Sequence, residues 1–399
     1  MSFVKETLET PVNYSCDVLI AGGGVAGIAA ALSAARAGKK SGIETKVILL
    51  EKCFMLGGLA TSGIVTIYLP ICDGLGNQVC FGLGEELLRL SIEYGAEARY
   101  PAPWLDGEGD RVKKRFEVQF NPQLFAISAE KLLEKEGVQI MYGATAVSVV
   151  EENGKITHVV IEGKGGREAI EVRRSVVDST GDADICALSK AKTEKFPDGN
   201  KLAAWYYGYG NRSYDLYMCG VHDDPGESTA TDLKDNYHFS GLDTKELSES
   251  VCISHSSMIK DIKARREKIS DLIPTTIATI PQVRMTRRLS GKYEQHIDEG
   301  NVTYKDTVGI YPNWRKKGVV YELPLSSLYG QEVKNLLTAG RCISVTNEMW
   351  DIIRVIPVCA VSGEGAGAAA ALCDDFENAD LEKIQSYLEG AGVKLHWEK

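Results

Sequence analysis

The sequence lacks the features that mark nucleic-acid-binding and membrane proteins. Its 45 lysines and arginines are outnumbered by 55 aspartates and glutamates, and the formal net charge is −10. Basic pairs such as Arg173-Arg174 are isolated. Because binding to a phosphate backbone needs clustered positive charge, we expect no nucleic-acid partner. No apolar run reaches the length needed to cross a bilayer, so we expect no membrane association.

Cysteine pairing motifs are also missing. The ten cysteines are scattered, without C-x-x-C or the paired spacing of metal ligands. Free thiols in a reducing compartment are the simplest interpretation, and we expect no metal site. The first fifteen residues are polar and do not resemble a signal peptide. We therefore expect a cytoplasmic protein, and its 399 residues are enough to bury a large core.

A glycine-rich stretch near the start is the most informative feature that is present. Residues 18–20 are typical of a buried parallel strand, and an Ala-rich segment with good helix propensity follows the glycines. In the G-x-G-x-x-G spacing, Gly22 allows a tight turn, Gly24 lets the backbone approach a pyrophosphate, and Gly27 lets helix and strand pack closely. The pyrophosphate would lie at the helix N-terminus. A glycine cluster that serves only packing is the alternative.

The next segments extend this pattern. A second strand, 46–50, ends at Glu51, whose carboxylate could accept hydrogen bonds from ribose hydroxyls. The Gly57-Gly58 pair then allows the backbone to pass close to something bulky, which we take to be an extended cofactor. A flexible loop is the alternative interpretation of this pair.

Further elements follow from periodicity and turn residues. Residues 64–80 suggest a strand, a turn and a return, and 99–111 an irregular loop. Residues 190–325 lack the alternation of strands and helices that the earlier part of the chain shows, and they suggest a second domain that covers the substrate. We expect helices at 84–94, from 122 onward and at 363–373. The helix from 122 would turn Leu124, Phe125, Ile127, Leu132 and Leu133 toward the core. We expect strands at 138–142, 146–150, 156–162 and 169–172, and a separate strand at 175–178.

Five segments together carry a family resemblance: AGGGVAGIAAALSAARAG, EKCFMLGGLATSG, VVDSTGDADICALSKA, RMTRRLSGKY and NLLTAGRCISVTNEMWDIIRVIPVCAVSGEGAGAAAAL. The chain resembles FAD-dependent oxidoreductases with a glutathione-reductase-type Rossmann domain. The fold class implied is α/β, with a Rossmann-type FAD-binding domain of parallel sheet plus antiparallel meander and an inserted α+β cap domain. The expected division is 1–70, 116–195 and 326–399 for the FAD-binding domain, 71–115 for an insertion and 196–325 for the substrate or cap domain.

The resemblance implies FAD as the cofactor and assigns residues to it. A helix beginning around Gly363–Gly365 would also direct its N–H groups at the negative charge of a reduced flavin. The implied cofactor-binding residues are Gly22, Gly24, Val25, Ala26, Gly27, Glu51, Lys52, Gly57, Gly58, Leu59, Thr61, Ala146, Val147, Thr180, Gly181, Asp182, Gly340, Arg341, Pro357, Gly363, Gly365, Ala366 and Gly367.

Two departures from related flavoproteins limit the expected chemistry. Disulfide reductases carry two cysteines four residues apart after the glycine pair, whereas Cys53 stands alone before it. Dithiol chemistry is therefore not expected. A separate G-x-G-x-x-G for NAD(P)H is also missing, so the electron donor or acceptor stays open.

The expected activity is flavin hydride transfer to or from a small organic substrate, which could be an anion. The candidate catalytic residues are Arg354, Arg288 and Tyr68, with Tyr293 and His255 as further proton-delivery candidates. An ion pair with Glu348 or Asp351 is the alternative role for Arg354, and salt bridges within the cap are the alternative for Arg288. A flavoprotein with a non-redox role, hydratase- or lyase-like or related to RNA modification, is the alternative function, and a homo-oligomer is compatible with the sequence.

Overall fold

The computed structural model describes residues 4–95, 98–219 and 238–398. Its centre is a seven-stranded sheet in the order β5-β2-β1-β8-β7-β6, with β16 also paired to β8. Strands β5, β2, β1, β8 and β16 run parallel, and β6, β7 and β8 form an antiparallel meander. The strand bounds are β1 Val12–Ala21, β2 Val47–Glu51, β5 Gln139–Tyr142, β6 Thr145–Glu152, β7 Lys155–Gly163, β8 Gly166–Asp178 and β16 Leu336–Thr338.

Strand β8 joins the meander to the parallel sheet. Its first half pairs with β7, its last residues pair with β16, and β1 accompanies it along nearly its whole length. The sequence predicted two separate strands at 169–172 and 175–178, and this division is wrong. The intervening Arg173 and Arg174 lie at an irregularity where the register with β1 shifts, and β8 continues through it because β1 pairs with it on both sides, at Val172 and at Ser175.

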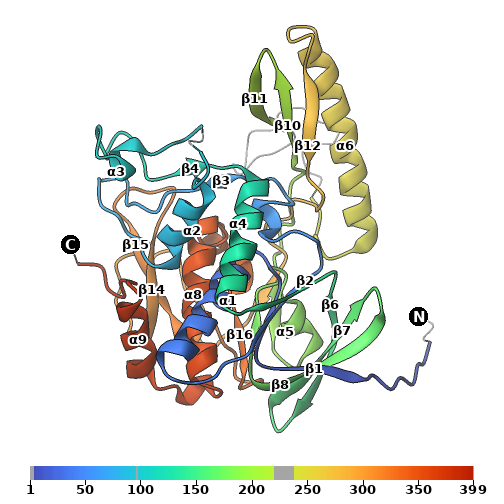
Figure 1. The fold of residues 1–399 in the computed structure, drawn as a ribbon, viewed down its shortest axis with the longest axis vertical. Helices are drawn as coiled ribbons and strands as arrows, with labels where there is room; N and C mark the ends of the chain where they lie inside the picture. Colours follow the sequence, from blue (N-terminus) through green and yellow to red (C-terminus); the bar gives the residue numbers. More distant parts are fainter. Residues whose placement is uncertain (1–3, 96–97, 220–237, 399) are drawn as a thin grey trace.

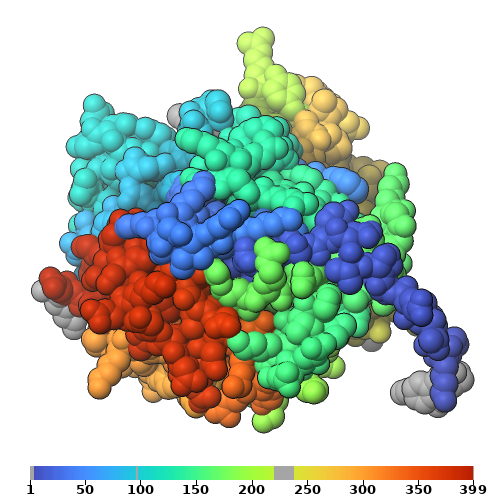
Figure 2. All heavy atoms as spheres, turned by 60° about the horizontal axis from the view of Figure 1, so that its bottom comes forward, coloured from blue at the N-terminus to red at the C-terminus, as the bar shows by residue number. Residues whose placement is uncertain are grey.

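Two Ala- and Gly-rich helices cover one face of the sheet. Helix α1 (Val25–Lys40) and helix α8 (Ile356–Leu372) pack together, so the N- and C-terminal parts of the chain lie side by side (Figures 1 and 2). A Cβ added at Gly363 would lie 2.2 Å from the Ala26 carbonyl oxygen, and one at Gly367 would lie 2.1 Å from that of Ala30. These glycines therefore set the distance between the two helices.

The start of α8 differs from the sequence prediction. The helix begins at Ile356 rather than near Gly363, with Pro357 in its first turn. Proline is well suited to a first turn because the missing N–H has no intrahelical acceptor there. Gly363 and Gly365 consequently lie in the helix interior, and their N–H groups do not form its N-terminus.

Smaller elements complete the main body around this core. The predicted inner face of α4 is partly wrong, since Leu124 is 39% and Ile127 is 58% exposed. Residues 102–105 form a short helix within the predicted loop, and the expected return strand in 64–80 is reduced to a Cys72–Gln78 bridge. The bounds are α2 Leu83–Ser91, α3 Ala102–Leu105, α4 Pro122–Lys135, α5 Asp184–Leu188, α7 Asn347–Ile353, α9 Leu381–Gly390, β3 Ile67–Tyr68, β4 Val118–Gln119, β9 Thr193–Lys195, β13 Arg287–Leu289, β14 Thr307–Pro312 and β15 Val320–Pro324.

A second layer projects from the main body, and we call its described residues, 200–219 and 238–283, the cap (Figure 1). It holds a sheet in the order β11-β10-β12, with α6 packed on one side. The predicted domain 196–325 also includes strands β14 and β15. These two strands pack in the main body instead, where β14 contacts α8 and α9. The cap bounds are β10 Ala204–Gly210, β11 Ser213–Cys219, α6 Thr244–Arg266 and β12 Ile273–Ile277.

The described helices were also compared with the length and composition of a membrane span. Taken singly, none of them is long and apolar enough to cross a bilayer. Helices α7 and α8 reach the length and apolar composition of a membrane span only when taken together, and they meet at an angle of 93°.

Candidate cofactor site

A long crevice opens at the carboxyl ends of β1 and β2, where α/β sheets commonly bind ligands. It encloses about 1330 Å³ of space between protein atoms, part of it open to solvent. Segments distant in the sequence form its walls. They are the β1–α1 turn and first residues of α1, 50–53, 57–60, 144–146, 179–182 with Asp184, 339–341, the α7–α8 junction with Arg354, Ile356 and Cys359, and the cap residues Gly241, Leu247, Ile280, Pro281 and Val283.

The three glycines of the G-x-G-x-x-G stretch have distinct surroundings. Gly22 has φ +102°, and a Cβ there would lie 2.6 Å from the Ser179 carbonyl oxygen, so the tight turn requires glycine. Gly27 packs against the Gly22 carbonyl, which a Cβ would approach to 1.8 Å. At Gly24, by contrast, a Cβ would meet no atom within 4 Å, because this position faces open crevice.

Gly24 is also the N-cap of α1, and no side chain caps this helix end. The N–H groups of a helix's first turn have no intrahelical acceptor, and the helix dipole adds positive potential there. Val25 and Ala26, in that first turn, line the crevice. This part of the crevice therefore suits an anionic group such as a pyrophosphate.

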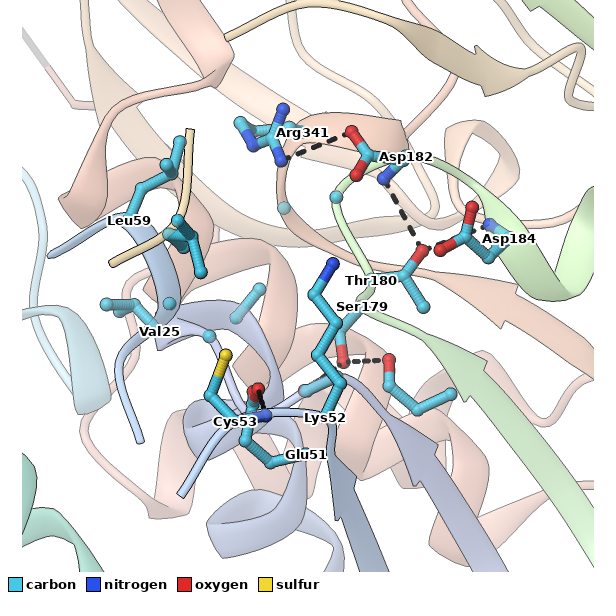
Figure 3. Close-up of a pocket in the computed structure, with 18 of the residues that line it drawn as sticks. Val25, Glu51, Lys52, Cys53, Leu59, Ser179, Thr180, Asp182, Asp184 and Arg341 are labelled. Atoms are coloured by element: carbon cyan, nitrogen blue, oxygen red, sulfur yellow. Dashed lines mark hydrogen bonds and ion pairs between the residues drawn. The ribbon is translucent and has the colours of Figure 1, made fainter. Parts of the chain in front are cut away.

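Glu51 places a carboxylate at the end of β2 in the crevice wall (Figure 3). Its Oε2 accepts a hydrogen bond from the Gly23 N–H at 2.9 Å, and its Oε1 accepts one from the Cys53 N–H at 2.7 Å. Burial raises the pKa of Glu51, while these two backbone donors act in the opposite direction. The two N–H groups fix the carboxylate, whose remaining lone pairs can accept from hydroxyl groups.

The acidic turn after β8 forms the opposite wall. Asp182 accepts a hydrogen bond from the Thr286 hydroxyl at 2.7 Å and forms an ion pair with Arg341 at 3.4 Å (Figure 3). Gly181, at φ +83°, lies so close to the Arg341 guanidinium that a Cβ would approach it to 2.3 Å. Arg341 also donates to the Arg284 carbonyl at 2.8 Å, so it ties the turn to the segment that leads from the cap.

Asp184 and Lys52 bring opposite charges to the same wall. Desolvation raises the pKa of Asp184 to about 6, and the neighbouring Asp178 and Asp182 add to this rise. Because 45% of the Asp184 side chain is exposed, water limits the effect. The Lys52 side chain extends from the end of β2 across the crevice toward this turn (Figure 3).

Arg354 lies at the junction of α7 and α8 and lines the crevice. Its guanidinium pairs with Asp351 at 2.6 Å, one of the two alternatives that the sequence suggested. Asp351 also pairs with Arg315 at 2.5 Å, so the carboxylate joins two arginines. Because Ile356 and Cys359 line the crevice too, the N-terminus of α8 faces it, seven residues earlier than predicted.

Two of the three predicted catalytic residues lie outside the crevice. Arg288 is 3% exposed and pairs with Glu194 at 2.8 Å and Glu294 at 3.2 Å, an ion-pair network that lies outside the cap rather than within it. Tyr68 is fully buried and donates its hydroxyl proton to the Gly84 carbonyl at 2.7 Å. Burial raises its pKa well above the usual value, which makes it a poor proton donor or acceptor.

The other two proton-delivery candidates also lie away from the crevice lining. Tyr293 donates to Glu299, and His255 lines a separate chamber in the cap.

The predicted cofactor-binding residues divide into two groups. Those that line the crevice are Gly22, Gly24, Val25, Ala26, Glu51, Lys52, Gly57, Gly58, Leu59, Ala146, Thr180, Gly181, Asp182, Gly340 and Arg341. Those that do not line it are Gly27, Thr61, Val147, Pro357, Gly363, Gly365, Ala366 and Gly367.

The second group has structural reasons for lying elsewhere. Thr61 donates its hydroxyl proton to the Leu56 carbonyl, which shapes the glycine-pair turn. Val147 is the extra residue at an irregularity in the β6–β7 pairing, between Ala146 and Ser148, and its side chain is half-buried outside the crevice lining. Pro357 and the α8 residues 363–367 are buried in helix packing, where Gly365 lies against Val308.

Sequence reasoning missed several crevice residues. Cys53 was assigned no role beyond its isolation, and the resemblance did not assign Asp184 to the cofactor, although both line the crevice. Ile356 is next to Pro357, which the resemblance assigns to the cofactor, but the direction in which the Ile356 side chain points depends on where α8 begins. No local motif marks the cap residues Gly241, Leu247, Ile280, Pro281 and Val283, because tertiary packing alone brings them to the crevice.

The walls of the crevice fit a dinucleotide cofactor. An uncapped helix N-terminus, a glycine with open space beside its Cα and a fixed carboxylate lie along one elongated hollow. These groups match a pyrophosphate and a ribose in the order that the β1–α1–β2 unit presents them.

Part of the chain is similar in sequence to a known flavoprotein oxidoreductase. The chain is 30% identical over 158 residues to the probable electron transfer flavoprotein-quinone oxidoreductase YgcN of Escherichia coli (strain K12), a match that covers 36% of this chain. It spans about a third of that relative's length, 32%.

Similar solved structures include a geranylgeranyl bacteriochlorophyll reductase-like protein from Thermoplasma acidophilum, with TM-score 0.41, 13% identity and coverage of 94% of this chain and 83% of that one. The anhydrotetracycline hydroxylase OxyS from Streptomyces rimosus is a second, with TM-score 0.43, 13% identity and coverage of 94% and 66%.

The family model described as FAD dependent oxidoreductase matches residues 17–204 and 221–388, which is most of the sequence. The matched region contains the crevice residues from both the main body and the cap. The chain therefore belongs to the FAD-dependent oxidoreductase family, and FAD is its cofactor.

Proposed function

We propose that the protein is a dehydrogenase or reductase that transfers a hydride between FAD and a small organic molecule. One observation carries this proposal: the cap completes the crevice. Gly241 and Leu247 approach it from one side of the cap, and Ile280, Pro281 and Val283 approach it from the segment after β12. A substrate that reaches the cofactor between main body and cap would be enclosed on both sides.

The residues of this chain would bind and orient the two reactants, and bound FAD supplies the hydride chemistry. The first turn of α1 and Glu51 would hold the cofactor's polar groups, as their hydrogen-bonding capacity requires. Apolar cap side chains would exclude water from the reacting region, which strengthens the electrostatic interactions within it.

Arg354 is the side chain we assign to charge stabilisation. It is the predicted catalytic residue that lines the crevice, and Asp351 fixes its orientation. A fixed guanidinium can bind an oxygen atom of the substrate or stabilise negative charge that develops on it. This role needs no proton transfer from the arginine itself.

An anaerobic metabolite screen tests the proposal. Purified FAD-loaded protein is mixed with candidate substrates, and bleaching of the flavin absorbance is recorded, with NADH and NADPH as separate additions. Bleaching by an organic compound, reversed by an acceptor, is the expected result. If neither the oxidised nor the photoreduced protein reacts with any compound tested, the non-redox alternative takes precedence.

A further inference from the structure

The cap contains a second chamber that adjoins the cofactor crevice. It encloses about 940 Å³ of space, part of it open to solvent. One face of α6, the segment 277–283 after β12, and residues 200–203 form most of its wall. Ile280, Pro281 and Val283 line both the chamber and the crevice, so the two spaces share a wall.

Most polar side chains in the chamber wall are already occupied by protein partners. Buried hydroxyl and amide groups bonded to backbone have little left to offer a ligand. Ser250 donates to the Leu247 carbonyl at 2.8 Å, Ser254 to the Ala203 carbonyl at 3.1 Å, and Thr279 to the Ser62 carbonyl at 3.4 Å. The Asn200 amide group donates to Met285 at 2.6 Å, and its oxygen accepts from the Arg284 and Met285 N–H groups.

Gln282 is only partly satisfied. Its amide nitrogen donates to the Gly63 carbonyl, and its Oε1 has no partner within the described part of the chain. This leaves one buried acceptor without a partner beside the chamber, within the described residues.

The chamber carries little charge. Its described lining includes no aspartate or glutamate. Lys201 is half-buried and His255 is exposed, so their polar ends can remain in water while their apolar parts contribute to the wall. Apart from these two residues and the serine, threonine, asparagine and glutamine side chains described above, the lining is apolar, with Leu202, Phe239, Val251, Met258, Ile277 and Ile280 among its side chains.

We infer that this chamber binds the uncharged, apolar body of the substrate, an aliphatic or aromatic portion whose reactive end reaches the crevice past Ile280, Pro281 and Val283. This inference rests on the proposed function and names its substrate class. It also departs from the expectation that the substrate could be an anion, because the Arg288 guanidinium pairs with Glu194 and Glu294 away from the crevice.

Equilibrium dialysis of FAD-loaded protein with prodan, a neutral naphthalene derivative, tests the inference. Val251→Trp would place an indole in the chamber, since Val251 lines it. Ile259→Trp is the matched control, because Ile259 lies on the same helix, is 54% exposed and is absent from the chamber lining. We expect Val251→Trp to weaken prodan binding at least tenfold and Ile259→Trp to leave it unchanged, with equal flavin content in all three proteins.

Competition then identifies the chemistry that the chamber recognises. Straight-chain 2-alkanones should displace prodan with an affinity that rises about fourfold for each added methylene until the chamber is full. Lactate and succinate should not displace it. If Val251→Trp does not fold, Val251→Phe takes its place, with Ile259→Phe as its control.

The outcomes separate the two proposals. Absence of prodan binding, equal binding to the Val251 variant, or displacement by lactate would overturn the apolar chamber and leave the oxidoreductase proposal standing. Prodan binding that follows the expected pattern in a protein whose flavin no compound reduces or re-oxidises would retain the chamber and overturn the proposed function.

Discussion

The main body and the cap build their parts of the site in different ways. In the main body, glycine turns and a helix N-terminus bring backbone to the crevice wall, beside a carboxylate that two backbone N–H groups hold. In the cap the chamber wall is made of side chains on α6 and on the segment after β12. A backbone wall suits a cofactor of fixed shape, whereas a side-chain wall can change its selectivity by single substitutions.

The two regions also differ in how closely they are packed. Helices α1 and α8 approach so closely that backbone carbonyls occupy the space of absent Cβ atoms. In the cap, the nearest atom to a Cβ added at Gly208 belongs to the Leu272 side chain, at 2.9 Å. Substitutions should therefore be costly in the main body and milder in the cap, and the following predictions test this difference from the largest expected effect to the smallest.

Gly24→Val should abolish FAD retention while the protein still folds. Gly24 has extended backbone that valine can adopt, and its Cβ would point into open crevice, where the side chain would occupy the pyrophosphate's space. Flavin absorbance per protein after gel filtration measures the effect. Gly165→Val, also at a position with open space, should keep its flavin. Full flavin content in the Gly24 variant would show that the cofactor lies elsewhere.

Glu364→Gln should stabilise the protein in alkaline solution. Glu364 is buried in α8 and accepts a hydrogen bond from the Leu83 N–H at 2.9 Å, and burial raises its pKa to about 8. Since the pKa in the folded state is above that in the unfolded state, the stability that this carboxyl group contributes is fully present below about pH 4.5 and is lost as pH rises from there to about 8.

Urea unfolding of both proteins at two pH values measures this effect. The glutamine variant should be more stable by on the order of 4 kcal/mol at pH 9, with little difference at pH 4.5. An equal difference at both pH values would show that the carboxyl group does not ionise with a shifted pKa.

Gly363→Ala should destabilise the main body more than Gly208→Ala destabilises the cap. The added methyl at Gly363 meets the Ala26 carbonyl at 2.2 Å, and two packed helices must separate to admit it. Overpacking of this kind costs about 1–3 kcal/mol. At Gly208 the nearest atoms belong to the Leu272 and Tyr217 side chains, at 2.9 and 3.0 Å. The nearest backbone atom, the Ile273 oxygen, is 3.2 Å away, so the cost should be smaller. Equal losses in urea unfolding would remove the distinction between the two regions.

Arg354→Ala should leave FAD bound and lower kcat about tenfold, a loss of about 1.4 kcal/mol of transition-state stabilisation. Arg315→Ala is the matched control, since Arg315 pairs with the same Asp351 carboxylate but does not line the crevice. Stopped-flow reduction of the flavin by a substrate from the metabolite screen gives the rate. Equal rates in the two variants would assign Arg354 a structural role.

The cofactor half of the site was largely predictable because its signals are local. The spacing of Gly22, Gly24 and Gly27 and the acidic end of β2 each specify a backbone conformation within a few residues. The helix start at Ile356 was missed although Pro357 marks it, because proline is favoured both in turns and in the first turn of a helix. Arg288 was misassigned because the sequence shows the arginine but not the carboxylates, such as that of Glu194, with which it pairs.

The sequence by itself determined the β1–α1–β2 unit, the meander and the glycine turns, because short-range sterics and hydrogen bonding dictate them. Only the tertiary structure decided that Arg354 rather than Arg288 or Tyr68 reaches the crevice. It alone also brought Ile280, Pro281 and Val283 between cofactor crevice and cap chamber. Those placements depend on long-range packing of residues far apart in the chain, which no local pattern encodes.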